Sequence, residues 1–246
     1  ALLCSGATER PIAFENNDRP GIMLAGALRT YANRYETAVG KRVAIFTNND
    51  DAYRTADDLI ASGVGVAAVI DTRDVGLKSS DYEVIANAQL CDSAGRLGVK
   101  SVRVKTGQAT RDIAVDAVGV SGGWNPNIHL TCHQRGRPEW DEGLSTFVPS
   151  ADLPHGLFVA GAANGQMSLS AALNDADKVA GTLVADLGYK AVASSVPKTD
   201  DKPVNQSAFW YVEGTQRGWV DQQNDVTVKD IKLAHQENFK SVEHLK

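Results

Sequence analysis

KRVAIFTNNDDAYRTADDLIASGVGVAAVIDTRD, residues 41–74, is the stretch that decides the fold of this chain. Its residues 42–46 form a short apolar run with β-branched side chains, which is typical of a strand buried on both faces. Apolar positions then recur at helical spacing, namely Tyr53, Ala56, Leu59 and Ile60. Gly63 ends this helix, and a second apolar run, residues 64–70, ends at Asp71. The stretch therefore predicts a right-handed strand–helix–strand crossover, the repeating unit of a doubly wound parallel sheet.

The turn after the first of these strands decides whether the unit can bind a dinucleotide. Asp71 lies where such folds place the carboxylate that holds an adenosine ribose. The turn, however, reads TNNDDAY from Thr47, with no glycine and two carboxylates. A pyrophosphate needs glycines for close backbone approach, and the carboxylates would repel it. We therefore expect the cofactor site of this unit to be closed, and a plain structural layer is the favoured interpretation of residues 41–74 taken alone.

Composition limits the classes of function open to the chain. It has 246 residues, 43% of them hydrophobic and 22% charged, with 22 glycines, which suits one α/β domain or one domain plus a further piece. The net charge of −5 and the lack of a basic run argue against a nucleic-acid partner. No apolar stretch reaches the length of a membrane span. The sequence therefore predicts a soluble protein with neither nucleic acid nor membrane as partner.

The cysteines and histidines give no catalytic or metal pattern. Cys4, Cys91 and Cys132 are odd in number and scattered, which suits a reducing compartment, so we expect a cytoplasmic protein. His129, Cys132 and His133 lie close together, but no second ligand pair follows at a usual spacing. We expect no metal site, and no arrangement of nucleophile, acid and base identifies a catalytic residue.

Outside the crossover, the hydrophobic pattern predicts a strand at residues 2–4 and a helix at residues 22–35. Three strand-like runs with short links predict an antiparallel meander at residues 82–90, 100–106 and 112–121. A last strand, residues 156–160, leads into a helix that we expect to begin at Gly161 and end near Leu187.

Two glycine turns at strand ends supply the candidate binding residues. They are Ser5, Gly6 and Ala7 after the opening strand, and Gly161, Ala162 and Ala163 after the last one. Such turns bring backbone N–H groups to the edge of a sheet, where a cofactor phosphate or ribose can lie. We expect the two turns to meet at the carboxyl edge of an outer sheet.

The order of these landmarks resembles the two-dinucleotide-binding flavoprotein fold, in which a crossover domain with a meander is inserted into a larger dinucleotide domain. The resemblance rests on three segments: residues 4–7 (CSGA), 116–127 and 159–162 (VAGA). It implies an α/β, doubly wound dinucleotide-binding fold with an inserted unit at about residues 38–128.

A closer resemblance, over nearly the whole chain, is to the alpha subunit of bacterial heterotetrameric sarcosine oxidase. The segments that carry it are residues 9–11 (ERP), 17–21 (NDRPG), 46–50 (FTNND), 121–126 (SGGWNP), 129–130, 147–149, 161–163, 220–221, 223–227, 229–231 and 239–246 (FKSVEHLK). Both ends look cut, so we expect an internal fragment. The resemblance implies a partial two-dinucleotide-binding domain at residues 1–188, a linker at 189–205, and the start of a folate-binding, aminomethyltransferase-like domain at 206–246.

The resemblance also implies a function: an oxidoreductase acting on CH–NH groups, of which this segment alone is expected to be inactive. Sarcosine would be oxidised at FAD on the beta subunit, FMN would pass electrons to oxygen, and tetrahydrofolate would accept the one-carbon unit. NAD would be bound by the alpha subunit itself, at the two glycine turns. The implied partners are the other subunits of a hetero-oligomer, especially the flavin-bearing beta subunit.

Two departures from the pattern leave alternatives open. Ala162 stands where the superfamily has an aspartate that bonds the cofactor's sugar chain, and residues 174–177 (NDAD) stand where related helices have glycine and small residues. One alternative is another flavin-linked dehydrogenase, for a different secondary amine or an opine. The other is a non-catalytic scaffold whose dinucleotide fold has lost ligand binding.

The C-terminal segment, residues 206–246, carries more large apolar side chains than a solvated segment should. They include Phe209, Trp210, Trp219, Phe239 and Leu245. Exposed patches of this kind mark contact surfaces, so we expect the segment to meet a following folate domain or a second subunit. The alternative is that it folds back on the inserted unit.

Overall fold

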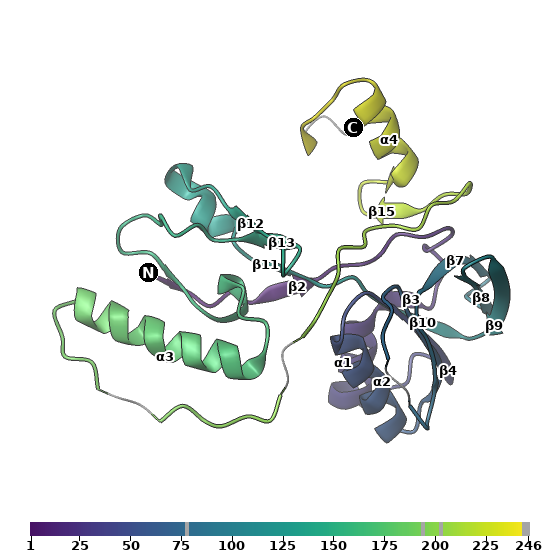
Figure 1. Ribbon diagram of the computed structural model, residues 1–246, viewed down its shortest axis with the longest axis horizontal. Helices are drawn as coiled ribbons and strands as arrows, with labels where there is room; N and C mark the ends of the chain where they lie inside the picture. The colour runs from purple at the N-terminus through teal and green to yellow at the C-terminus, as the bar shows by residue number, and fades with distance from the viewer. Residues whose placement is uncertain (77–78, 193–194, 202–203, 243–246) are drawn as a thin grey trace. The chain divides into compact units, whose positions relative to one another are not determined.

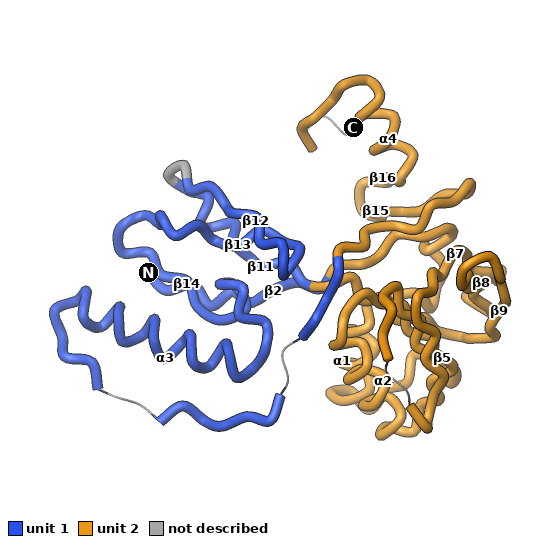
Figure 2. Tube along the Cα trace, in the orientation of Figure 1, with its two compact units in different colours: residues 1–9, 124–207 blue, residues 10–123, 208–246 orange. Residues whose placement is uncertain are grey.

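The computed structural model describes residues 1–246 except 77–78, 193–194, 202–203 and 243–246 (Figure 1). The chain forms two compact units (Figure 2): the first unit is Ala1–Glu9 with Trp124–Ser207, and the second is Arg10–Gly123 with Ala208–Lys246. The predicted linker and the end of the tail, with Leu245, fall partly outside the described residues.

The second unit is built on a parallel sheet of five strands. In spatial order they are β3 (Ile22–Leu24), β10 (Ala117–Ser121), β4 (Arg42–Thr47), β5 (Gly65–Asp71) and β6 (Glu83–Ile85). Helix α2 (Asp51–Ala61) connects β4 to β5, which pair in parallel, so the predicted crossover is confirmed. With α1 (Ala25–Tyr35), it packs on one face of the sheet, and the meander strands lie on the other.

Strand β4 shows why this stretch decides the fold. Val43 and Ile45 belong to the core under the two helices, whereas Ala44 and Phe46 belong to the core on the opposite face. All four are at most 1% exposed. Because successive strand side chains point to opposite faces, an unbroken apolar run is what a strand covered on both sides requires.

The helix predicted for residues 22–35 was wrong in its first turn. Ile22–Leu24 form strand β3, which pairs in parallel with Val118–Val120 of β10, and α1 begins only at Ala25. Gly21 has φ +97°, and its carbonyl accepts a hydrogen bond from Val118 N at 2.8 Å. The free edge of β10 offers backbone hydrogen bonds that the helical spacing of the apolar residues does not reveal.

The predicted antiparallel meander is confirmed, with different strand limits. It consists of β7 (Ala88–Ala94), β8 (Ser101–Thr106) and β9 (Ala109–Ala114). The runs at 82–90 and 112–121 each divide between two sheets: the first supplies β6 and the start of β7, the second the end of β9 and all of β10. Two single strands were therefore the wrong prediction, because the chain changes sheets within each run.

Asp116 lies between β9 and β10, where the chain makes the second of these changes of sheet, and its side chain fixes that change. Its carboxylate accepts hydrogen bonds from Arg42 N at 2.8 Å and Lys41 N at 3.0 Å, at the start of β4. Burial acts to raise the pKa of Asp116, but the backbone N–H groups of Arg42 and Lys41 outweigh it and hold the pKa below its ordinary value.

A specific acid dependence follows from Asp116. A carboxyl whose pKa is lower in the folded than in the unfolded protein stabilises the fold above the unfolded pKa, about 4, and this contribution is lost as pH falls through the folded pKa. We expect the thermal stability of wild type to fall more steeply below about pH 4 than that of Asp116→Asn. The exposed Asp81→Asn variant should follow wild type. Parallel acid profiles for wild type and Asp116→Asn would contradict this role.

The C-terminal segment packs against residues 12–17 of the second unit. Its elements are β15 (Trp219–Asp221), β16 (Val226–Thr227) and α4 (Val228–Gln236). Phe209 packs edge-on against Phe46 with ring centroids 6.4 Å apart, and Val212 lies in the same core, 5% exposed. The folding-back alternative therefore describes Phe209, Val212 and the backbone of Trp219. The side chains of Trp210, Leu233 and Val242 stay exposed.

Backbone and side-chain hydrogen bonds join the two segments. Ala13 N donates to Trp210 O, and Val212 N donates to Ala13 O. The buried Asn17 side chain bridges Trp219: its Nδ2 donates to Trp219 O, and its Oδ1 accepts from Trp219 N, both at 2.8 Å. Residues 17–21, noted above for the family pattern, thus begin with the residue that fixes the tail.

In its described residues, the first unit contains short strands and one long helix. Its strands are β1 (Leu2–Leu3), β2 (Ala7–Glu9), β11 (Trp124–Pro126), β12 (Glu139–Asp141), β13 (Thr146–Val148) and β14 (Phe158–Val159). Its helices are the 3-10 helices η1 (His129–Arg135) and η2 (Gly161–Asn164), and α3 (Leu169–Asp186). Of the helices that the structure describes, none combines the length and apolar character needed to cross a membrane.

Candidate functional site

The first predicted turn, Ser5 to Ala7, is held by one residue, Asn127, through its side chain and its backbone. Asn127 Nδ2 donates to Ser5 O at 3.0 Å, Ser5 Oγ donates to Asn127 O at 2.7 Å, and Asn127 N donates to Gly6 O at 2.9 Å. Gly6 has φ +71°, and a Cβ added there would meet no atom within 4 Å. Ala7 begins β2, which pairs with Pro126 of β11. The turn is thus rigidly held, with open space beside Gly6.

The second predicted turn is a 3-10 helix rather than the start of a long helix. The helix η2 contains Gly161, Ala162 and Ala163. It ends at Gly165, which has φ +77°, and α3 begins only at Leu169. The prediction of one continuous helix from Gly161 was therefore wrong, because Gly165 adopts a left-handed conformation that ends the helical turn.

The structure brings the ends of the two strands together. Strands β1 and β14 pair in parallel, with Leu3 opposite Val159, and Ala160 N donates to Leu3 O at 2.9 Å. The two turns follow the carboxyl ends of this pair, at the same edge, where open α/β sheets bind their ligands.

A carboxylate from α3 reaches the second turn. Asp175 Oδ2 accepts from Gly161 N at 2.9 Å, and Asn164 Nδ2 donates to the same carboxylate at 3.2 and 3.3 Å. Asp175 belongs to residues 174–177, noted above as a departure from the family pattern, and its side chain binds the turn.

A second carboxylate caps the start of α3. Asp201 accepts from Leu169 N at 2.6 Å and Ser170 N at 3.1 Å, while Ser168 Oγ accepts from Ala171 N at 3.2 Å. The pKa of Asp201 is lowered most by the hydrogen bond from the Thr199 hydroxyl, and further by the N–H groups of Ser170 and Leu169. The expected free N–H groups of this helix therefore carry a negative partner from the chain itself.

At the corresponding edge of the second unit, the ribose position is filled by a polar network. Asp71, which is 0% exposed, accepts from Tyr53 Oη at 2.8 Å and from Arg73 Nε and Nη2 at 3.0 and 2.8 Å. Arg73 Nη2 also lies 2.8 Å from Asp50 Oδ1. Burial is the largest cause that raises the pKa of the Tyr53 hydroxyl, and the nearby Asp71 carboxylate raises it further. Burial acts to lower the pKa of Arg73, but its bonds to Asp71 and Asp50 raise it.

The glycine-free turn of that unit is also tied to a neighbouring strand. Asn49 Nδ2 donates to Ser121 O at 3.1 Å and to Ser121 Oγ at 3.0 Å, and Asn48 Nδ2 donates to Gly122 O at 3.3 Å. Asn48 and Asn49 are both 0% exposed. The side chains thus occupy the place that glycines leave open for a pyrophosphate in dinucleotide-binding turns.

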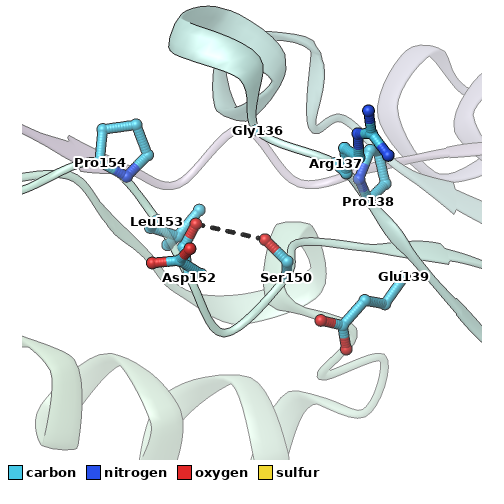
Figure 3. Close-up of a pocket in the computed structure, with 8 residues that line it drawn as sticks. All are labelled: Gly136, Arg137, Pro138, Glu139, Ser150, Asp152, Leu153 and Pro154. Atoms are coloured by element: carbon cyan, nitrogen blue, oxygen red, sulfur yellow. Dashed lines mark hydrogen bonds between the residues drawn. The ribbon is translucent and has the colours of Figure 1, made fainter.

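The first unit also contains a cavity of about 460 Å³ (Figure 3). It is lined by Gly136, Arg137, Pro138, Glu139, Ser150, Asp152, Leu153 and Pro154. None of the predicted site residues lines it. Among the described residues, no group of three or more His, Cys, Asp or Glu side chains could hold a metal ion.

Three residues at the first-unit edge were missed as site residues: Asn127, Asp175 and Asp201. Asn127 ends the Trp-Asn-Pro-Asn segment noted above, so that motif was a usable signal. Asp175 and Asp201 lie 14 and 32 residues from the backbone groups that they bind, and no local pattern links such pairs.

The fold defines the class of protein first. The chain matches the crystal structure of L-proline dehydrogenase from P. horikoshii over 100% of its length and 47% of that chain, with TM-score 0.67 and 19% identity. It matches thioredoxin reductase from T. acidophilum over 76% of its length and 65% of that chain, with TM-score 0.60 and 16% identity. The chain therefore has an α/β dinucleotide-binding fold like that of these two proteins, as the sequence predicted.

Sequence comparison then gives the particular relationship. Residues 215–246 match the family model described as sarcosine oxidase A3 domain. The chain is 40% identical over 250 residues to sarcosine oxidase subunit alpha of Rhizobium meliloti (strain 1021), an alignment that covers 99% of this chain and 25% of that protein. The chain is thus related, along its whole length, to a segment of sarcosine oxidase alpha subunits, and the predicted resemblance is confirmed. It spans about a quarter of the length of this relative.

Proposed function

We propose that the chain is part of the alpha subunit of a hetero-oligomeric sarcosine oxidase, an oxidoreductase that acts on the CH–NH group of a secondary amine. The observation that carries this proposal is the 40% identity to such a subunit across 99% of the chain. In the proposed complex, sarcosine is oxidised at FAD on the partner beta subunit, electrons pass through FMN, and tetrahydrofolate accepts the one-carbon unit.

The proposed role of the chain itself is to bind NAD at the edge formed by the two turns. The binding residues are Ser5, Gly6, Ala7, Gly161, Ala162 and Ala163. Two features support this role: both turns follow a parallel pair of strands, and the space beside Gly6 is open. NAD is a dinucleotide with two ribose diols and a pyrophosphate, and the chain would contribute backbone groups that orient it.

The binding role can be tested with Gly6→Ala. The added methyl group would project into the open space beside the turn, at a residue whose φ of +71° disfavours any side chain. We expect the affinity of the intact protein for NAD, measured by calorimetry, to fall by about tenfold, equivalent to roughly 1.4 kcal/mol. Gly188→Ala is the matched control, since Gly188 has φ +80° and equally open surroundings beyond α3. Equal affinities of both variants and wild type would reject the placement at Gly6.

A non-catalytic scaffold is the second candidate. One observation favours it: the N–H groups of Gly161, Leu169 and Ser170 are already bonded to carboxylates of the chain. If the intact wild-type protein binds no NAD, the scaffold replaces the cofactor-binding role.

The second unit is proposed to bind no dinucleotide of its own. Its turn carries buried Asn48 and Asn49, and Asp71 already holds Arg73 and Tyr53. We expect crystals soaked in NAD to show no pyrophosphate density beside Asn48 and Asn49. Density for a pyrophosphate there would overturn the proposal.

A further inference from the structure

The cavity of the first unit is lined by two segments that lie apart in the sequence (Figure 3). One segment, residues 136–139, leads from η1 into β12, and the other, residues 150–154, lies between β13 and β14. A volume of about 460 Å³ is in the range of small-molecule sites in proteins. The cavity is distinct from the two glycine turns, because none of their residues lines it.

Charged side chains of both signs line this cavity. Arg137 and Glu139 come from the first segment, and Asp152 comes from the second. Within the part of the chain that the structure describes, none of these three side chains forms an ion pair or a hydrogen bond with another residue. The hydroxyl of Ser150 donates to the backbone oxygen of Asp152 at 3.4 Å, which leaves the Asp152 carboxylate available. One guanidinium and two carboxylates therefore face one cavity without neutralising one another.

The wall between these charges is apolar. Pro138, Leu153 and Pro154 line the cavity and are half-buried. A guanidinium recognises a carboxylate through paired N–H donors, and a carboxylate accepts hydrogen bonds from an ammonium group. A ligand that matches all three features carries a carboxylate, an ammonium group and an aliphatic side chain.

We propose that this cavity binds an aliphatic amino-acid zwitterion, as a free amino acid or as a dipeptide. Arg137 binds the carboxylate of the ligand, and Asp152, from the other segment, binds its ammonium group. Glu139 adds a second negative charge to the cavity, which disfavours ligands with a further anionic group, such as phosphates and dicarboxylates. The site goes beyond the proposed function, because it involves neither NAD nor the glycine turns.

Leucine, leucinamide and N-acetylleucine are the probes, because they share one side chain and differ in charge. Leucinamide lacks the carboxylate, and N-acetylleucine lacks the ammonium group. Their dissociation constants for the intact wild-type protein are measured by ligand-observed NMR. We expect leucine to bind at least about tenfold more tightly than either derivative, because each derivative loses one charge-assisted contact. Glycyl-leucine, titrated in the same way, distinguishes a dipeptide from a free amino acid as the preferred ligand.

Two variants assign the charges to their residues. Arg137→Gln should weaken leucine binding about tenfold and leave leucinamide binding unchanged within about twofold, since leucinamide has no carboxylate. Asp152→Asn should weaken leucine binding by a similar factor and leave N-acetylleucine binding unchanged. Both side chains are exposed and make no hydrogen bond to another described residue, so both variants are expected to fold. Arg96→Gln and Asp186→Asn are the matched controls, because they remove the same charges at exposed positions outside the cavity.

Three results would overturn the proposal. The first is that wild type binds neither leucine nor glycyl-leucine. The second is equal affinity of wild type for leucine and its two derivatives, which would show that the cavity does not recognise charge. The third is a loss of leucine binding in the control variants as large as in the cavity variants. Because none of these measurements involves NAD, failure of the proposed NAD site is a separate result.

Discussion

Replacing Asp71 with alanine is expected to lower the free energy of unfolding of the second unit by about 3–5 kcal/mol. The Asp71 carboxylate is 0% exposed and joins Tyr53, Arg73 and the backbone N–H of residue 73. Without it, the Arg73 guanidinium, whose side chain is 13% exposed, keeps only the carboxylate of Asp50 among its two acidic partners. Removing one partner of a buried ion pair costs far more than the pair contributes, because the charge that stays buried loses part of its compensation.

Chemical denaturation followed by tryptophan fluorescence measures this loss. Asp74→Ala is the matched control, since it removes an exposed aspartate three residues away and should change stability by no more than about 0.5 kcal/mol. Similar losses for both variants would show that the polar network contributes nothing specific. The network would then be an incidental arrangement of side chains.

Replacing Asn17 with alanine is expected to release the C-terminal segment locally. Two hydrogen bonds, both to the backbone of Trp219, are lost, and each partly buried group left unpaired costs about 1–3 kcal/mol. Hydrogen exchange at the amide of Trp219 should accelerate, and a protease should cut residues 215–225 before it cuts the parallel sheet.

Asn224→Ala serves as the control for Asn17→Ala. Asn224 is exposed in the turn of the same hairpin and donates to Asp221 Oδ2 at 2.7 Å. Its loss should leave exchange at Trp219 near the wild-type rate. If Asn17→Ala also leaves that rate unchanged, the packing of Phe209 and Val212 alone holds the segment.

The crossover could be predicted from the sequence because its signals are local. The unbroken apolar run of β4, the spacing of Ala56 and Leu59, and the stop at Gly63 all lie within one short stretch. The order of the strands in the sheet was less accessible. Ile22 has the spacing of a helix, yet it pairs with Val118 nearly a hundred residues later.

The candidate site likewise has residues that the sequence reveals and residues that it does not. Gly6 and Gly161 could be chosen from the sequence because turns at strand ends leave a local pattern. The partners that set the chemistry of the site come from elsewhere: Asn127 is 122 residues from Ser5, and Asp201 is 32 residues from Leu169. A carboxylate that neutralises a helix start is an ordinary surface aspartate until the chain has folded.

The parallel pairing of Leu2 with Phe158 has a consequence for the order of events during synthesis. Strand β1 is synthesised before the parallel sheet, but its partner β14 follows more than 150 residues later, after every strand of that sheet. Contacts between such distant residues form late, because closing the long loop between them costs conformational entropy before any contact can stabilise the chain. The nested sheet is therefore expected to be complete while β1 is still without its partner β14. The edge proposed to bind NAD would be assembled after it, and a chaperone that holds exposed strands would act at residues 1–9.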